Sequence, residues 1–217
     1  MNRKLLLVGS AAVLGMAIFA GTLLYIGGKV QPSAQAVERK QAGLVQFYSP
    51  TIGHPEAKVH IVEFLDPACE TCASFYPHVK KIMAANPDRV RLTIRLVPFH
   101  KGSDYVVKVL DAARKQGKFW PVLEALLAGQ AYWVRNHTVQ PELVWKPLES
   151  LGLNLDQIRV DMNAPDVAQR IEQELKDAKA LKVTQTPEYF VNGRPLPEFG
   201  LEQLQRLVRE ELQATYR

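Results

Sequence analysis

Two cysteines lie three positions apart in the segment Cys69-Glu70-Thr71-Cys72, and the chain contains no other cysteine. Two thiols at this spacing at the start of a helix can close a disulfide. The helix N-terminus also stabilises a thiolate, because its free backbone N–H groups and its dipole favour negative charge. A thiolate is the attacking species in thiol–disulfide exchange. We therefore predict that Cys69 is the nucleophile and that Cys72, one turn into the helix and more buried, is the resolving thiol.

Two further features accompany the cysteine pair. Glu63 lies six residues before Cys69 in an apolar segment, where a buried carboxylate is costly unless it is partnered. Burial would raise its pKa and let it exchange a proton with Cys72 through water; the alternative is an exposed glutamate on an edge strand.

Thr186-Pro187 stands before the last predicted strands, and cis peptide bonds are essentially confined to X-Pro. A cis Pro187 would leave the backbone of Thr186 free to pair with an extended substrate; an ordinary trans proline is the alternative.

The elements that must position these residues follow from the hydrophobic pattern. Residues 59–65 and 90–97 are short and largely apolar, which predicts two buried strands. A helix is predicted between them over 69–85, with a kink at Pro77. The three elements form a β-α-β unit, so the strands should be parallel. One more short strand is predicted over 44–48.

The middle of the chain is predicted to be helical. Helical periodicity and start signals mark five segments, at residues 104–115, 119–127, 141–151, 155–162 and 165–181. Together they form an α-helical block over about 103–182. The block interrupts a compact α/β unit and can lie outside its sheet.

Strand signals return after the helical block. Residues 188–191 and 194–199 flank Asn192-Gly193, which is a strong signal for a hairpin turn. Prolines confine the second of these strands to an edge. An amphipathic helix is predicted over 201–212, so the order of elements is β-α-β, helical block, β-β-α.

This combination of residues resembles the thioredoxin superfamily. The resemblance is carried, over about residues 44–215, by Glu63-x5-Cys69-x2-Cys72 and by Thr186-Pro187-x-x-Phe190-Val191-Asn192-Gly193. The helical block makes the chain similar to the DsbA-like thiol–disulfide oxidoreductases of the bacterial envelope. The resemblance implies an α/β thioredoxin-like fold with an α-helical insertion. It also implies that Cys69 is the exposed nucleophile, Cys72 the resolver, Glu63 the buried acid and Pro187 the cis-proline, with Thr186 shaping the substrate contact.

The dipeptide between the cysteines departs from the family pattern. DsbA-like oxidants commonly have Pro-His there, and this chain has Glu70-Thr71. A histidine can stabilise the neighbouring thiolate, whereas a carboxylate opposes it. We therefore predict that the pKa of Cys69 is higher, and its reduction potential less oxidising, than in strongly oxidising relatives, whose potential is about −120 mV.

Two other functions remain open for the same cysteine pair. A copper-binding or copper-delivery protein could hold Cu(I) with the dithiol, although none of the five histidines has an obvious ligand spacing to the cysteines. A structural disulfide that never turns over would stabilise the fold only weakly, because it closes a very short loop. An oxidoreductase needs no bound cofactor, since the Cys69–Cys72 pair itself cycles, and no metal site is predicted for it.

The N-terminal segment is predicted to anchor the protein in a membrane. Residues 5–28 carry no charge over 24 positions, and about 20 apolar residues span a bilayer as a helix. Arg3 and Lys4 should stay in the cytoplasm, which places the domain in the periplasm of a bacterial inner-membrane protein. The sequence Ala34-Gln35-Ala36 offers the alternative of a cleaved signal and a soluble periplasmic protein.

The domain organisation and the expected partners follow from composition. We predict a signal anchor over 1–28, a polar linker over 29–43 and a folded domain over 44–217. Three basic residues and no acidic residue lie in residues 1–30, so the net charge of +5 leaves about +2 for the rest of the chain. This is too little for a nucleic-acid surface. The expected partners are protein thiols and disulfides and a membrane redox partner.

Overall fold

A mixed sheet lies at the centre of residues 43–216, the part of the chain that this computed structural model describes. Its strand order is β1-β3-β2-β6-β7. The strands are β1 (Thr51–Ile52), β2 (Val59–Leu65), β3 (Val90–Leu96), β6 (Glu188–Val191) and β7 (Arg194–Pro195). The predicted anchor over 5–28 lies outside the described residues. Within residues 43–216, no helix is both long and apolar enough to cross a membrane.

The predicted β-α-β unit is confirmed. β2 and β3 pair in parallel over their full length, from Val59 opposite Val90 to Leu65 opposite Leu96. Helix α3 (Glu70–Ala84) connects them and contains Pro77 in its interior. The predicted hairpin is also present, because β6 and β7 pair around Asn192-Gly193 with positive φ at both turn residues. Its second strand, predicted over 194–199, ends at Pro195, because Pro195 and Pro197 cannot donate to a ladder.

The two faces of the sheet are covered by different helices. In β2 the side chains alternate, and Ile61 and Leu65 pack in one core cluster with buried residues of α3 and of α9 (Leu201–Thr215). Val62 and Phe64 pack in the second cluster with Ala178 of helix α8 (Pro165–Leu181). Glu63 therefore belongs to the face that α3 covers.

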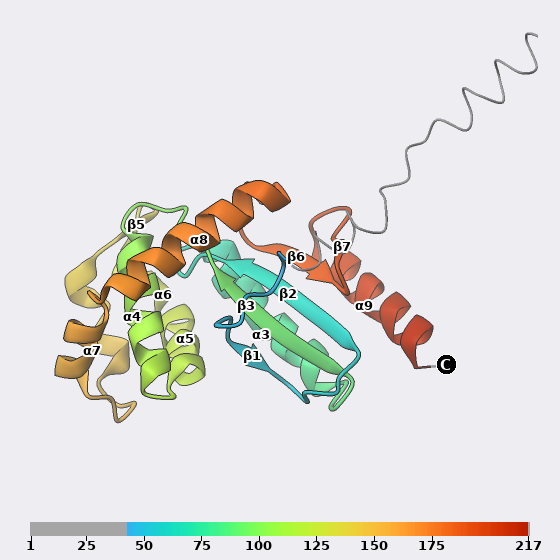
Figure 1. Cartoon of the computed structure of the whole chain (residues 1–217), viewed down its shortest axis with the longest axis horizontal. Helices are drawn as coiled ribbons and strands as arrows, with labels where there is room; N and C mark the ends of the chain where they lie inside the picture. Colours follow the sequence, from blue (N-terminus) through green and yellow to red (C-terminus); the bar gives the residue numbers. More distant parts are fainter. Residues whose placement is uncertain (1–42, 217) are drawn as a thin grey trace, which may run out of the picture. The chain divides into compact units, whose positions relative to one another are not determined.

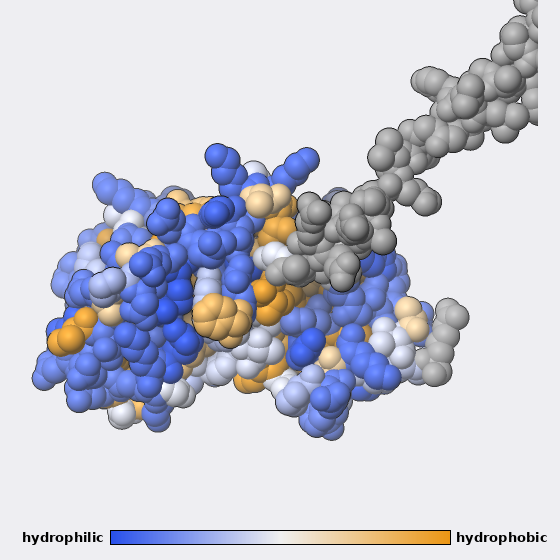
Figure 2. Space-filling model, in the orientation of Figure 1, coloured by the Kyte–Doolittle hydropathy of each residue, from blue (hydrophilic) through white to orange (hydrophobic). Residues whose placement is uncertain are grey.

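The helical block lies between β3 and β6 in the chain. It contains α4 (Ser103–Lys115), α5 (Phe119–Ala128), α6 (Gln130–Trp133), α7 (Leu155–Asp161) and α8. Figure 1 shows α4 to α7 gathered at one end of the sheet and α8 returning across it. In Figure 2 the surface over this block is mostly hydrophilic, and apolar side chains reach that face mainly over the sheet.

Two further predictions of secondary structure are wrong. Residues 44–48 do not form a strand: they make a turn in which Ser49 N donates to Gln46 O at 2.9 Å, and the short edge strand is β1 instead. Residues 141–151 are not an α-helix but two 3₁₀ turns, η1 (Pro141–Leu143) and η2 (Lys146–Leu148). Pro147 lacks the N–H that an α-helix would need there.

The helical block also contains a hairpin that the sequence did not predict. It pairs β4 (Val134–Arg135) with β5 (Thr138–Val139), and its turn residues Asn136 and His137 both have positive φ. The strands have only two residues each, which is too short for a periodic signal.

Arg95 joins α8 to the sheet. Its side chain lies fully buried against the Phe64 ring, 5.1 Å from the ring centre. Nε donates to Glu174 at 2.7 Å and Nη2 donates to Asp177 at 2.6 Å. Nη1 donates to the carbonyl of Gly43 at 2.7 Å, so one guanidinium holds α8, β3 and the start of the described chain together.

Replacing Arg95 should be strongly destabilising. In Arg95→Leu the buried carboxylate of Glu174 loses its charged partner, which typically costs about 3–5 kcal/mol. Urea unfolding of the full chain should show this loss. The control is Arg159→Leu, which removes an exposed ion pair with Asp156 and should change the free energy of unfolding by less than about 1 kcal/mol. Equal effects of the two changes would contradict the role of Arg95.

Candidate functional site

Cys69 is the N-cap residue of α3. Its backbone is extended (φ −79°, ψ 117°), and its Sγ accepts a hydrogen bond from the backbone N–H of Cys72 at 3.4 Å. Both cysteines are free thiols; Cys69 is 5% exposed and Cys72 is fully buried. Cys69 is thus buried, not exposed as the resemblance implied, although it is slightly more accessible than Cys72, and its sulfur lies at the helix N-terminus.

The Thr186–Pro187 segment lies directly against this sulfur. The peptide bond between the two residues is cis, and the Cys69 thiol donates to the carbonyl oxygen of Thr186 at 3.2 Å. The two segments are 117 positions apart in the sequence. The sequence-predicted residues Cys69, Cys72, Thr186 and Pro187 therefore form one site.

Glu63 lies in the interior beneath the cysteine pair, not on an edge strand. It is fully buried in β2, between β3 and β6, and its register partner in β6 is Tyr189. The Tyr189 hydroxyl donates to Glu63 Oε1 at 3.1 Å, whereas Oε2 has no hydrogen-bond partner among the described residues. Burial raises the pKa of Glu63 to about 8, and the charge of Cys69 adds to this rise.

The two cysteines have opposite electrostatic environments. A hydrogen bond from the Cys72 thiol is the largest cause that lowers the pKa of Cys69 to about 6. The side chain of Thr186 and the backbone N–H groups of Thr71 and Cys72 act in the same direction, and burial opposes them. Burial raises the pKa of Cys72 far above its ordinary value. At neutral pH the site therefore holds one thiolate and one thiol.

Two buried polar side chains fix the start of α3, a role that the sequence pattern did not indicate. Asp66 accepts hydrogen bonds from the backbone N–H groups of Ala68, Phe99 and His100, from the His100 ring at 2.7 Å and from the Ser103 hydroxyl. Gln130, from α6, donates to the carbonyl oxygens of Pro67 and Cys69 at 2.7 and 3.0 Å. The Asp-Pro pair at the end of an apolar strand could have indicated the role of Asp66. No sequence pattern around Gln130 indicates its role.

Glu70 does not act on Cys69 in the way the sequence suggested. Its carboxylate pairs with the ring of His137, with Oε2 and Nδ1 3.0 Å apart, and both side chains are exposed. Glu70 is not among the main causes that set the pKa of Cys69. That pKa still lies above the value of about 3.5 known for the strongly oxidising DsbA. His137 comes from the β4–β5 hairpin, which the sequence did not predict.

The structure was also compared with the ligand requirements of a metal site. In the described part of the chain, no group of three or more His, Cys, Asp and Glu side chains could hold a metal ion. A Cu(I) site made of two thiols is smaller than such a group; the copper-binding alternative is instead not favoured because the relatives described below are an oxidoreductase and a probable disulfide bond formation protein.

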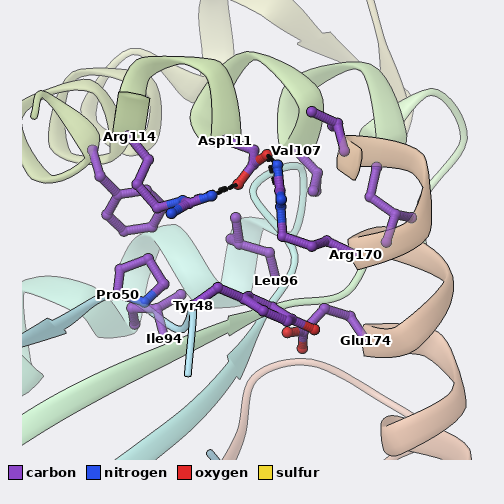
Figure 3. Close-up of a pocket in the computed structure, with 12 residues that line it drawn as sticks. Tyr48, Pro50, Ile94, Leu96, Val107, Asp111, Arg114, Arg170 and Glu174 are labelled. Carbon is purple, nitrogen blue, oxygen red and sulfur yellow. Dashed lines mark hydrogen bonds and ion pairs between the residues drawn. The ribbon is translucent and has the colours of Figure 1, made fainter. Parts of the chain in front are cut away.

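A separate small cavity lies between α4, α8 and the sheet. Figure 3 shows the Asp111 carboxylate held between Arg114 and Arg170, with Tyr48 and Glu174 below them. The cavity has a volume of about 30 Å³, which is enough for roughly one water molecule. None of the predicted site residues lines it, so it is not part of the site described above.

Comparisons with known proteins identify a family for this chain. Residues 46–210 match the family model described as Thioredoxin. A solved thioredoxin-like oxidoreductase from Silicibacter pomeroyi DSS-3 is 31% identical, with a TM-score of 0.66, and the match covers 77% of this chain and 94% of that chain. A probable disulfide bond formation protein D from Bacillus cereus is 24% identical over 97% of this chain and 98% of its own.

A third relative is much longer than this chain. The Na(+)/H(+) antiporter NhaA of Herminiimonas arsenicoxydans is 29% identical over 86% of this chain, but the match spans only 30% of the antiporter. The family match, in contrast, covers the sheet, the cysteine pair, the helical block and most of α9. The chain therefore belongs to the thioredoxin superfamily.

Proposed function

We propose that this chain exchanges disulfides with protein substrates through Cys69 and Cys72. The observation that carries the proposal is the position of the Cys69 sulfur. It lies at the helix N-terminus, has a pKa of about 6 and is 3.2 Å from the Thr186 carbonyl. A thiolate is thus present at neutral pH beside a backbone segment that can receive a peptide.

The reaction proceeds through a mixed disulfide. When the chain acts as a reductant, the Cys69 thiolate attacks a substrate disulfide, a Cys69–substrate bond forms and one substrate thiolate leaves. Cys72 then loses its proton and attacks Cys69, which closes the Cys69–Cys72 disulfide and releases the second substrate thiolate. The oxidising direction is the reverse sequence. Glu63 exchanges the proton of Cys72, since a carboxyl with a pKa of about 8 can take up and release protons near neutral pH.

Thr186 and Pro187 form the substrate-binding edge. A hollow of about 220 Å³ adjoins them, lined by Gln185, Pro187, Leu196 and Phe199 among others. A substrate strand that pairs with the Thr186 backbone would place a side chain next to its cysteine in this hollow. The substrate cysteine itself would then face Cys69.

The N-terminal sequence supports a location for the enzyme. Residues 5–28 are apolar and follow Arg3 and Lys4, which supports a single-pass anchor in a bacterial inner membrane with the domain in the periplasm. A tether confines the domain to the membrane surface and raises the effective concentration of partners there. Electrons would therefore pass to or from a redox partner in the same membrane.

Removing the resolving thiol should trap substrates. In Cys72→Ala the mixed disulfide cannot be resolved within the chain, so covalent complexes with protein substrates should accumulate and should disappear on reduction. Non-reducing electrophoresis of the variant, expressed as the full chain, measures this. The matched control is Cys69→Ala, which should form no such complexes. Equal trapping by both variants would contradict the assignment of Cys69 as the nucleophile.

Alkylation of the reduced protein should depend on pH as expected for a low-pKa thiol. Because the pKa of Cys69 is lowered, its thiolate is present above about pH 6 and is lost as the pH falls through that value. The rate of iodoacetamide labelling should thus have its midpoint near pH 6. In Cys72→Ala the midpoint should move upward, because the main stabilising hydrogen bond is gone. A wild-type midpoint above pH 8 would contradict the proposed thiolate.

The reduction potential should be less oxidising than that of DsbA. The Cys69 thiolate is less stabilised here than in DsbA, so the reduced form is favoured less and the potential should be more negative than about −120 mV. A glutathione redox titration followed by mass spectrometry measures it. A value at or above −120 mV would show that the pKa of Cys69 does not set the potential.

A further inference from the structure

Tyr189 is a buried polar side chain to which the exchange chemistry described so far gives no role. It is fully buried in β6, and its ring stacks on Phe75 of α3 with the ring centres 6.4 Å apart. Its hydroxyl is hydrogen-bonded to one atom of the site, Glu63 Oε1, at 3.1 Å. A phenylalanine would fill the same space without this bond, so the hydroxyl itself needs an explanation.

The phenol can act only as a donor to Glu63. Burial and the neighbouring charges of Glu63 and Cys72 raise the pKa of Tyr189 well above its ordinary value, so it keeps its proton. The hydrogen bond stabilises the carboxylate form, because bonds to a charged acceptor are stronger than bonds to a neutral one. In the structure this bond is the main influence that lowers the pKa of Glu63 against the effect of burial.

The bond also makes the two carboxyl oxygens of Glu63 different. Oε1 is occupied by Tyr189, whereas Oε2 is buried and has no partner among the described residues. A proton on the carboxyl group therefore resides on Oε2, since Oε1 already accepts a hydrogen bond. Cys72 lies on the α3 side of the same core, and the charge of Glu63 acts on its thiol.

We propose that Tyr189 is a positioning residue that holds Glu63 so that Oε2 receives the proton of Cys72 when Cys72 attacks the mixed disulfide. In this step the Cys69–Cys72 bond forms, the bond from Cys69 to the substrate sulfur breaks, and the electron pair leaves with the substrate thiolate. The proton of Cys72 goes to Glu63. The proposal rests on the proposed function, because it assumes that Cys72 resolves the mixed disulfide.

The charged and titratable groups around Glu63 support this order of events. From α3 they are Cys69, Cys72 and Tyr76, and from β6 it is Tyr189. The Cys69 thiolate raises the pKa of Glu63, so the mixed disulfide, in which Cys69 is uncharged, has a more acidic Glu63. Glu63 is thus ionised more readily at the stage at which it must accept a proton.

The test separates attack by Cys69 from resolution by Cys72. Reduced full-length protein is mixed with the aromatic disulfide dithiobis(nitrobenzoate) in a stopped-flow instrument between pH 5 and 9. The first equivalent of coloured thiolate reports attack by Cys69, and the second reports attack by Cys72 on the mixed disulfide. Cys72→Ala should release only the first equivalent.

Tyr189→Phe should slow only the second phase. Loss of a hydrogen bond to a charged group should shift the pH midpoint of this phase upward by about one unit and make it about tenfold slower at pH 7. The first phase should stay within about twofold of wild type, which also shows that the variant is folded. The matched control is Tyr76→Phe, whose lost hydroxyl donates to Glu124 instead of Glu63, and it should follow the wild type in both phases.

A second variant keeps the test independent of the stability of Tyr189→Phe. Glu63→Gln should itself slow the second phase, and adding Tyr189→Phe to it should cause no further change, because the acceptor is already gone. Identical second-phase profiles for wild type and Tyr189→Phe would overturn the role of Tyr189. A wild-type protein that releases only one equivalent would instead overturn the proposed function.

Discussion

The site depends on where helix α3 begins. The Cys69 sulfur can accept from the Cys72 N–H and reach the Thr186 carbonyl only if the chain leaves β2 and enters the helix at one position. Asp66 fixes this turn through hydrogen bonds with the segment around His100. Gln130 fixes it from the helical block. Because a buried carboxylate must keep its donors, a shift of this turn by one residue would be costly.

Differences in burial and hydrogen bonding give two chemically identical thiols different pKa values in this site. Cys69 has donors and some solvent, so its thiolate is favoured, whereas Cys72 has neither and stays protonated. Glu63, beneath them, is kept largely neutral by the same burial. The low dielectric that suppresses charge at Cys72 and Glu63 keeps the proton on Cys72 until it attacks, and it leaves a buried carboxyl group near it that can take up that proton.

Most of the sheet and the long helices could be predicted from the sequence, since β2, β3, α3 and α8 have clear periodicity, and a proline lies close to at least one end of each. The errors have physical causes. Leu44 is apolar because it packs under α8, not because its segment is a strand. Pro147 divides a helical pattern into 3₁₀ turns. The β4–β5 hairpin, and with it the contact between His137 and Glu70, is too short to leave a pattern.

The sequence by itself determined which residues could do the chemistry. A pair of cysteines at a helix start, a glutamate in an apolar strand and a Thr-Pro before a hairpin are local signals, and all of these residues converge on one site. Only the tertiary structure decided their electrostatics. The partners that set the pKa values of Cys69 and Glu63 include Thr186 and Tyr189, which lie more than a hundred residues away in sequence. Burial and hydrogen bonding to distant residues leave no periodic trace, because they arise only when the strands pair.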